Sequence, residues 1–345
     1  MSNPTLRIGT RGSELALWQA NYIAGELRRR GYQVSVEIIR TTGDRMQDPA
    51  SSVPSSLDVG SPLDAKGIFI KELEDSLAAG RIDLAVHSLK DLPTALDPRF
   101  TLAAIPTRAD ARDAFVCESA WGLHMLPSGA RIGTTSPRRQ AMLLALRPDV
   151  RFVELRGNVD TRLRKWQEGQ ADALVLAAAG LDRLNRTAHV HQRFSVDELC
   201  PAPGQGALAL EVRCPSFKPC HPEAHRGPRR AGSPGWEPKD LLLDTAIHEA
   251  VAALNDPDAA FATTAERTVL HALGGGCSLP VGAYCHAEDD RWHLHAMVVS
   301  PDGEQVAHVI EKAPPGIPPE ELGHRAAEAL KARGALELLA EPARA

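Results

Sequence analysis

Hydrophobic residues in the first part of the chain follow the periods of strands and helices in alternation. The pattern predicts a strand at residues 6–10, a helix that begins at the N-cap Ser13, and an alternating strand at residues 34–38. A helix ending at Gly80 and an apolar strand at residues 82–86 come next. Strand, helix and strand in this order predict a sheet that is at least partly parallel.

A second unit repeats this order, and the C-terminal part differs from both. Ser136 and Pro137 suit the N-cap and first position of a helix. The strands predicted around that helix cover residues 131–135, 152–155 and 173–178. The C-terminal part predicts a helix with a threonine N-cap, three antiparallel strands and a closing helix, at residues 263–272, 281–285, 292–300, 305–311 and 320–333.

Two segments show neither the helical nor the strand period of hydrophobic residues. Residues 41–64 are rich in Ser, Pro, Asp and Gly and predict a long loop near the mouth of the first sheet. Residues 214–240 contain six prolines and predict an exposed, linker-like insertion. The spacing of Cys214, Cys220, His221 and His225 in this insertion fits no standard zinc pattern, so no metal site is expected.

Composition and charge exclude several classes of protein. The 345 residues are 43% hydrophobic and 24% charged, which suits two or three globular domains. A formal net charge of −5 argues against a general nucleic-acid binder. We expect no membrane partner and a cytoplasmic location, because there is no signal pattern and the most apolar run, residues 173–181, is too short to span a bilayer. The six cysteines are expected to be reduced.

Basic residues gather at the predicted carboxyl ends of the strands, where open α/β sheets bind their ligands. Arginine predominates over lysine, which suits planar recognition of carboxylate or phosphate groups, so the ligand should be a polyanion. The polar residues at these positions are Arg11, Ser13, Lys90, Asp91, Ser136, Arg138, Arg139, Arg156, Arg162 and Arg183.

Three of these residues admit more than one role. Arg138 and Arg139 fall in the first turn of a helix, where they oppose the helix dipole unless guanidiniums and free N–H groups hold an anion together. The alternative is two solvated arginines. Asp91 is either the salt-bridge partner of nearby cations, or a group that transfers protons or stabilises a developing positive charge.

A loop of three glycines precedes Cys277, just beyond the predicted helix at residues 263–272. Glycine weakens regular elements and is used where the backbone bends sharply or lies close to another group, so the loop suggests a presented thiol. The alternative is a glycine C-cap beside a buried, inert cysteine. The arginine-rich strand ends elsewhere in the chain favour the presented thiol.

A series of motifs, in family order, resembles the hydroxymethylbilane synthase (porphobilinogen deaminase) family. The series covers most of the chain, and its specificity lies in the order of the motifs, since each one alone is weak. The matching segments are residues 7–13, 15–19, 66–74, 85–93, 133–140, 155–162, 179–184 and 203–207, and the glycine-cysteine loop.

The resemblance implies an α/β fold with two lobes like those of periplasmic binding proteins, and a small α+β C-terminal domain with a three-stranded antiparallel sheet. The chain should cross between the lobes twice, so that residues 199–212 return to the first. The expected parts are domain 1 at residues 1–107 and 200–213, domain 2 at 108–199, the proline-rich insertion at 214–240, and domain 3 at 241–345.

The resemblance also implies the chemistry. Enzymes of this family condense four porphobilinogen units head to tail on a dipyrromethane cofactor, which here would be held by a thioether bond to Cys277. Asp91 would be catalytic, stabilising the cationic azafulvene formed as ammonia leaves, and Lys66 and Phe69 would belong to a lid. The residues expected to bind substrate and cofactor carboxylates are Arg11, Ser13, Lys90, Ser136, Arg138, Arg139, Arg156, Arg162 and Arg183. The family favours a monomer.

Two other functions stay open at this point. A two-lobed, non-catalytic polyanion-binding protein would use the same lobes, because a fold does not fix a function. Such a protein has no need of the glycine-cysteine loop. A thiol-dependent acyl transferase is disfavoured because no motif pairs a histidine with Cys277, and His271 falls on the preceding helix.

Overall fold

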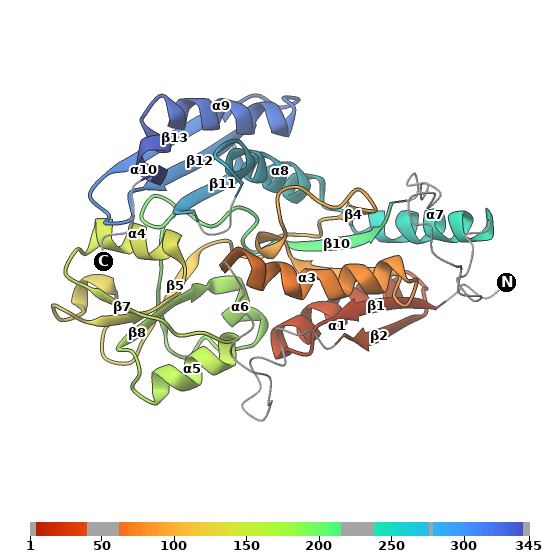
Figure 1. The fold of residues 1–345 in the computed structure, drawn as a ribbon, viewed down its shortest axis with the longest axis horizontal. Coiled ribbons are helices and arrows are strands. Elements are labelled where there is room, and N and C mark those ends of the chain that lie inside the picture. The colour runs from red at the N-terminus through yellow and green to blue at the C-terminus, as the bar shows by residue number, and fades with distance from the viewer. Residues whose placement is uncertain (1–4, 40–61, 215–237, 276–278, 341–345) are drawn as a thin grey trace, which may run out of the picture.

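A computed structural model describes residues 5–39, 62–214, 238–275 and 279–340. These residues form three sheets, each with its own helices, and Figure 1 shows the three parts side by side. Among them, no helix combines the length and the apolar character that crossing a membrane requires. The α/β architecture with a small C-terminal antiparallel sheet is confirmed.

The first sheet has the strand order β2-β1-β3-β10-β4. Strand β1 pairs in parallel with both β2 and β3, whereas β10 runs antiparallel between β3 and β4. The expected return of the chain to this lobe is therefore confirmed by β10. The strands are β1 (Leu6–Thr10), β2 (Val34–Ile38), β3 (Leu84–Ser88), β4 (Phe100–Ala104) and β10 (Leu208–Arg213).

The second sheet repeats that topology with the order β7-β6-β8-β5-β9. Strand β6 pairs in parallel with β7 and β8, and β5 runs antiparallel between β8 and β9. In each lobe the chain enters its antiparallel strand directly after crossing over from the other lobe. The strands are β5 (Asp113–Cys117), β6 (Arg131–Gly133), β7 (Arg151–Val153), β8 (Ala173–Ala177) and β9 (Val190–Arg193).

Helices cover both faces of each lobe's sheet. In the first lobe, α1 (Glu14–Arg29) and α7 (Pro238–Ala252) share one core, and α3 (Pro62–Ala78) packs on the opposite face. In the second lobe, α4 (Pro137–Leu146) covers one face, and α5 (Val159–Gln167) and α6 (Ala178–Arg183) cover the other. Each of these mostly apolar sheets is thus buried on both faces.

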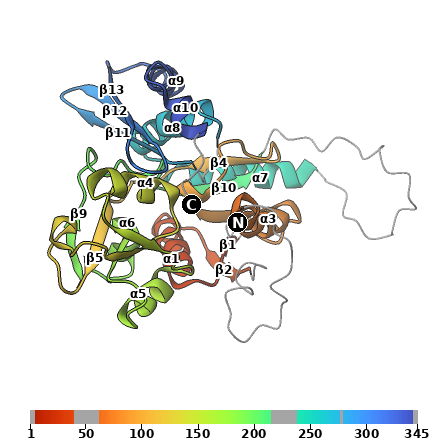
Figure 2. The same ribbon diagram turned by 60° about the vertical axis from the view of Figure 1, so that its left-hand side comes forward.

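The third sheet is the antiparallel meander β11 (Val281–Glu288), β12 (Arg291–Val299) and β13 (Val306–Ala313). Helices α8 (Pro257–Ala272), α9 (Pro319–Lys331) and α10 (Ala335–Ala340) form one core with it. Its other face contributes Met297 and Val299 to the core of the second lobe. Figure 2 shows the sheet lying above α4, which agrees with that shared core.

Some boundaries differ from the sequence expectation. The threonine N-cap predicted for the helix before the cysteine loop is wrong: α8 starts six residues earlier, and Asp256 caps it by accepting the Asp258 and Ala259 N–H groups. Thr263 lies inside the helix, where its hydroxyl donates to the carbonyl of Ala259. The loop expected at residues 41–64 ends where α3 begins, at Pro62.

Helix α7 lies in the part of the chain that the sequence assigned to domain 3 from residue 241 onwards. Its residues Ile247, Ala250 and Val251 are buried in the core of the first sheet. The helix begins at Pro238, so it also takes up the last three residues of the expected insertion; residues 215–237 lie outside the described part of the chain.

One buried carboxylate joins the two chain crossings to the third domain. Glu266 on α8 is fully buried, and it accepts two hydrogen bonds from Arg108 at 2.6 and 3.0 Å. It also accepts the backbone N–H groups of Gly204 at 2.7 Å and of Cys285 at 2.8 Å. Arg108 lies where the chain leaves the first lobe, Gly204 where it returns, and Cys285 on β11, so Glu266 fixes their relative positions.

Replacing Glu266 by Gln should destabilise the protein strongly. Removing one partner of a buried ion pair leaves the other charge uncompensated, which costs about 3–5 kcal/mol. Urea unfolding followed by circular dichroism would measure the loss. The matched control is Glu168→Gln, which removes the exposed partner of Arg164 and should cost less than about 1 kcal/mol. Equal effects of the two substitutions would contradict this role for Glu266.

Candidate functional site

The carboxyl ends of the parallel strands in the two lobes face a common cavity. Its wall combines residues of α1 and the end of β3 from the first lobe with residues of β8, α5 and α6 from the second. The returning segment before β10 closes it. The lining residues are Leu15, Ser88, Lys90, Arg139, Val159, Arg162, Leu176, Ala177, Ala179, Gly180, Arg183, Gly206 and Ala207.

Four of these lining residues are cationic: Lys90, Arg139, Arg162 and Arg183. No aspartate or glutamate lines the cavity within the described ranges. Like charges gathered without an opposing acid, in a cleft with low-dielectric walls, produce a strong local potential. The arrangement therefore suits an anionic ligand, although the whole chain carries a net charge of −5.

Arg162 and Arg183 are held half-buried by the second lobe. Burial lowers the pKa of each guanidinium to about 10, and for Arg162 the neighbouring charge of Arg139 lowers the pKa further while Asp91 raises it. Both side chains therefore stay protonated near neutral pH. The buried Nε of Arg162 has no hydrogen-bond partner. Such an orphaned donor in a cationic wall fits a carboxylate supplied by a ligand.

Arg183 also connects the two lobes. It donates to the carbonyl of Gly206 at 2.8 Å, and its guanidinium lies 5.7 Å from the ring centre of Trp18 on α1. Lys90, at the end of the first lobe's strand β3, donates to Oε1 of Gln205 at 3.1 Å. The cations of the cleft are therefore oriented by the returning segment at residues 204–206.

Behind this wall, the buried carboxylate of Asp113 binds two of the expected cleft arginines. It accepts hydrogen bonds from Arg138 at 2.6 Å, from Arg139 at 2.7 and 3.0 Å, and from the side-chain amide of Gln205 at 3.0 Å. Burial alone would raise the pKa of Asp113, but the two guanidiniums lower it to about 2. Two cations on one carboxylate leave a net positive charge.

Arg138 differs from the sequence expectation in its location. It is 3% exposed, is absent from the described lining of the cavity, and donates to the carbonyl of Cys200 at 2.6 Å as well as to Asp113. The expected anion near the start of α4 is thus, for this arginine, the protein's own Asp113. Arg139 binds the same carboxylate and still lines the cavity.

Asp91 directly follows the lining residue Lys90 at the end of the short 3₁₀ helix η1 (Leu89–Asp91), and its side chain is exposed. The three residues after it are bound by the third domain: Arg267 on α8 donates to the carbonyls of Leu92, Pro93 and Thr94, at 3.2, 2.5 and 3.3 Å. The hydroxyl of Thr94 lies 3.3 Å from Nδ1 of His271. The C-terminal end of α8 is thereby fixed beside Asp91.

The cysteine loop starts at this point. Gly274 and Gly275 have φ values of 109° and 70°, which favour glycine, and a Cβ on Gly275 would lie 3.3 Å from Oγ1 of Thr94. The sharp bend expected of the glycines is confirmed at these two positions. Cys277 itself lies outside the described residues, two positions further along the chain.

The other predicted site residues occupy varied positions. Ser13 and Ser136 are the N-caps of α1 and α4, so their oxygens accept the N–H groups of Ala16 and Arg139. Arg11 is half-buried, whereas Arg156 is exposed and pairs with Glu154 at 3.1 Å. The side chains of Lys66 and Phe69, on α3, lie outside the described part of the structure.

Sequence reasoning missed Asp113, Gln205, Arg108 and Glu266, which hold the site from behind. The segment at residues 203–207 carried one signal, its paired glycines. Gly206 has φ of 86°, and a Cβ there would lie 2.5 Å from the carbonyl oxygen of Ala109. Only glycine allows the returning chain to approach the outgoing chain so closely.

Comparisons with known proteins give a consistent result. Residues 6–217 match the family model described as "Porphobilinogen deaminase, dipyromethane cofactor binding domain", and residues 260–332 match "Porphobilinogen deaminase, C-terminal domain". The chain is 44% identical to a porphobilinogen deaminase from Rubrobacter xylanophilus, covering 97% of this chain and 96% of the relative. It is 42% identical to the porphobilinogen deaminase of Syntrophotalea carbinolica, covering 99% and 96%.

Solved structures show only a distant likeness. A TRAP periplasmic solute binding protein from Desulfovibrio salexigens has a TM-score of 0.40 and 11% identity, covering 75% of this chain and 74% of that chain. An ABC transporter periplasmic substrate-binding protein from Coxiella burnetii has a TM-score of 0.39 and 14% identity, covering 74% and 94%. The two-lobed fold is established by the order of the strands in the two sheets described above.

Asp113→Asn should cost stability in a pH-dependent way. The pKa of Asp113 is lower in the folded protein than in the unfolded chain, so its stabilising charge is fully present above about pH 4 and is lost as pH falls toward about 2. The pH-dependent part amounts to roughly 2 kcal/mol. Urea unfolding of both proteins between pH 7 and pH 3 should show a difference that is constant near neutrality and narrows in acid.

Asp149→Asn is the matched control, because the pKa of Asp149 is also lowered to about 2, by Arg147, but at an exposed site. The Asp149→Asn substitution should change the urea concentration at the midpoint of unfolding little. A difference between wild type and Asp113→Asn that stays the same down to pH 3 would contradict the proposed ionisation of Asp113.

Proposed function

This chain belongs to the porphobilinogen deaminase family, and from that premise we propose that Asp91 is the catalytic residue and that the cationic cleft binds the carboxylates of substrate and product. The protein is a transferase of tetrapyrrole biosynthesis that condenses porphobilinogen units head to tail, releases ammonia at each step, and yields hydroxymethylbilane. The observation that carries the proposal is a cavity lined by four cations and, within the described residues, by no acid; the charge of Asp91 acts on one of these cations, Arg162.

The residues present fit the family's dipyrromethane cofactor. That group carries carboxylate side chains, and the cavity offers cations together with the orphaned Nε of Arg162. When bound by a thioether to Cys277, dipyrromethane supplies the pyrrole carbon to which the first substrate unit is joined. Gly275, two positions before Cys277 in the chain, lies close to Thr94, which is three positions after Asp91.

Asp91 acts on the substrate in this proposal. Its exposed carboxylate is three residues from Thr94, close to the start of the cysteine loop, and its charge acts on Arg162. A carboxylate here accepts the pyrrole N–H of porphobilinogen and stabilises the positive charge that develops as ammonia leaves. Holding both reacting pyrroles in one orientation lowers the barrier further.

The basic residues have different roles in this proposal, according to where they lie. Lys90, Arg139, Arg162 and Arg183 line the cavity and bind the acetate and propionate groups directly. Arg138 acts through Asp113 as a positioning residue for Arg139, which revises its expected role. Arg11, Ser13, Ser136 and Arg156 complete the expected set; the two serines contribute by capping helix N-termini that attract anions. Lys66 and Phe69 on α3 belong to a lid in this proposal.

We also propose that the protein works as a monomer in the cytoplasm. The described part of the chain contains four free cysteines, Cys117, Cys200, Cys214 and Cys285, as expected in a reducing compartment. A non-catalytic polyanion-binding protein is disfavoured, because the matching C-terminal family domain and the cysteine loop have no use in simple binding lobes.

Intact mass and ammonia release together test this function. Wild-type protein should carry an excess mass of two deaminated porphobilinogen units, and Cys277→Ala prepared identically should carry none. Asp91→Asn should keep the excess mass but lose about 100-fold or more of its rate of ammonia release, because it can no longer offset the developing charge. Normal turnover by Asp91→Asn would contradict its catalytic role. A wild type without adduct, even after incubation with porphobilinogen, would overturn the enzyme assignment.

Arg162→Gln and Arg164→Gln form a matched pair on one helix. Arg162 lines the cavity, whereas Arg164 is exposed and pairs with Glu168. Losing one charge-assisted hydrogen bond costs about 1.5–3 kcal/mol, so Arg162→Gln should lower kcat/KM for porphobilinogen about 10- to 100-fold. Arg164→Gln should leave it unchanged. Equal losses in both variants would show that general charge, and not the cavity contact, matters.

A further inference from the structure

The third sheet presents histidines on the face that turns away from its helices. Along β12, Leu294, Ala296 and Val298 are buried in the core with α8 and α9. Because side chains alternate along a strand, His293 and His295 point to the other face. That face reaches the second lobe, where Met297 joins the core.

Four imidazoles form a row across this face. His286 on β11 lies 5.5 Å from His293 and 5.7 Å from His295, both on β12, measured between ring centres. His308 on β13 lies 6.1 Å from His295. Imidazole is the commonest metal ligand among side chains, and such a row on one sheet face has no part in the chemistry of the cleft.

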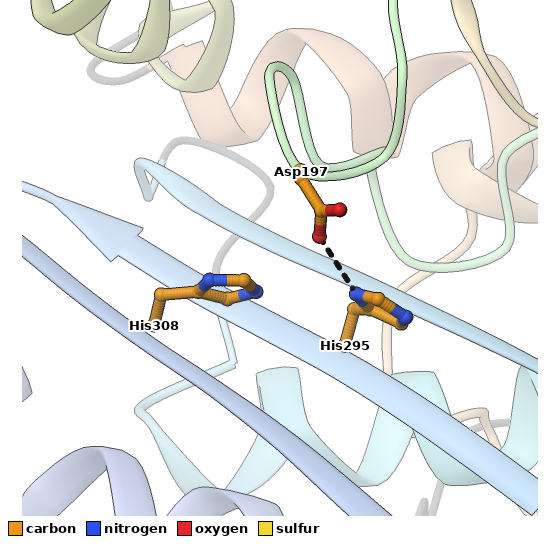
Figure 3. Close-up of side chains that lie close together, drawn as sticks. All are labelled: Asp197, His295 and His308. Carbon is orange, nitrogen blue, oxygen red and sulfur yellow. Dashed lines mark ion pairs between the residues drawn. The ribbon is translucent and has the colours of Figure 1, made fainter.

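Asp197 completes a triad at one end of the row. It comes from the loop between β9 and β10 and lies over β12 and β13, so that its carboxylate faces His295 and His308 (Figure 3). The ligand atoms that these three residues offer all lie within 4.8 Å of one another. They are contributed by three separate segments of the chain.

The nitrogens in this triad lack the hydrogen bonds that buried polar atoms normally make. Nδ1 of His295 and Nε2 of His308 are buried, and neither has a hydrogen-bond partner. Nδ1 of His295 lies 3.2 Å from Oδ1 of Asp197, but without the alignment of a hydrogen bond. Burial lowers the pKa of both histidines, which favours the neutral imidazole that binds metals.

We propose that Asp197, His295 and His308 form a binding site for a divalent transition metal ion of the zinc class. Ligands bound at about 2.0–2.1 Å in a tetrahedron lie about 3.3 Å apart, which matches the 3.2 Å between His295 and Asp197. Two imidazoles and one carboxylate are ordinary zinc ligands, and water takes the fourth position. The metal satisfies both orphaned nitrogens.

The site connects parts of the molecule that the reaction depends on. Asp197 lies in the segment that returns the chain from the second lobe to the first, and both histidines belong to the third sheet. A bound ion therefore fixes the returning segment to the domain that bears the cysteine loop. The ion is structural in this proposal, since the triad contains no residue of the cationic cleft.

No local pattern in the amino-acid sequence points to this site. Its ligands are separated by 98 and 13 positions, from the residue numbers 197, 295 and 308, and no standard zinc spacing contains such intervals. The sequence instead drew attention to Cys214, Cys220, His221 and His225, of which residues 220, 221 and 225 lie outside the described part of the chain.

A second group of three residues also has the arrangement of possible metal ligands. His286, Glu288 and His293 also bring three ligand atoms within 4.8 Å of one another. Glu288 is 58% exposed and lies 3.7 Å from His286 and 3.5 Å from His293, so solvent and these pairings already satisfy it. The second triad contains one buried nitrogen without a hydrogen-bond partner, Nδ1 of His286, whereas the first contains two, Nδ1 of His295 and Nε2 of His308, and is therefore the one we assign.

The test titrates ZnCl₂ by calorimetry into holoenzyme that has been stripped with a chelator, for wild type, His308→Gln, Asp197→Asn and His324→Gln. His324 is an exposed histidine on α9 and serves as the control. We expect one equivalent to bind wild type and His324→Gln, and affinity to fall about 100-fold in the other two variants. Thermal unfolding without metal checks that each variant folds, and Asp197→Asn, on an exposed side chain, keeps the test valid if His308→Gln does not fold.

Co²⁺ absorption identifies the ligands. Nitrogen and oxygen ligands should give weak visible bands without the intense near-ultraviolet band of a cobalt–thiolate bond. Unchanged affinity in both His308→Gln and Asp197→Asn would overturn the proposal. So would a thiolate band, or loss of binding in His293→Gln with retention in His308→Gln, since these outcomes place the ion on cysteine or on the second triad.

Discussion

Two buried carboxylates, Asp113 and Glu266, hold this molecule in its arrangement. Asp113 lies just after the chain crosses into the second lobe, and Glu266, on α8, binds both crossing segments; each is bound by arginine and by further N–H donors. A buried charge is costly unless it is paired and hydrogen-bonded, so these acids are compatible with folding only when the crossings, the second lobe and the third domain are all in place. The segments around the cleft must therefore reach their final arrangement for the chain to fold.

The ion pairs of Asp113 keep its negative charge behind the cleft wall and leave positive charge at the cavity surface. Asp113 lies behind the wall with Arg138, and Arg139 faces forward, so the acid holds the cations without neutralising them at the cavity surface. A protein with net charge −5 can in this way present a locally positive site. Low-dielectric surroundings strengthen every contact that a carboxylate ligand makes there.

Local signals in the sequence predicted most of the fold, and long-range pairing escaped them. Ser13 and Pro137 have the predicted places at helix starts because capping depends on a few neighbouring residues. The threonine cap of α8 was wrong because Asp256, seven positions before Thr263, offered a better cap.

The cationic strand ends were evident because parallel strands bring their carboxyl ends together. Which of these cations face the cleft was not evident. Arg138, on α4, binds Asp113, which lies 25 positions earlier on β5. No periodicity reveals such a partner. For the same reason local motifs singled out Cys277 and Asp91 as candidate site residues, but not the contacts between Arg267 and the carbonyls after Asp91 that join that segment to α8.

Those contacts bear on how the product can grow. The Arg267 side chain binds the backbone carbonyls of Leu92 and Pro93, and Gly275 lies close to the hydroxyl of Thr94, so α8 and the start of the cysteine loop both contact the segment after Asp91. The start of the cysteine loop and the segment after Asp91 are therefore held close to each other. Under the proposed function, a growing chain of carboxylate-bearing pyrroles would meet several separate cations in the neighbouring cavity, Lys90, Arg139, Arg162 and Arg183, and not one tight pocket.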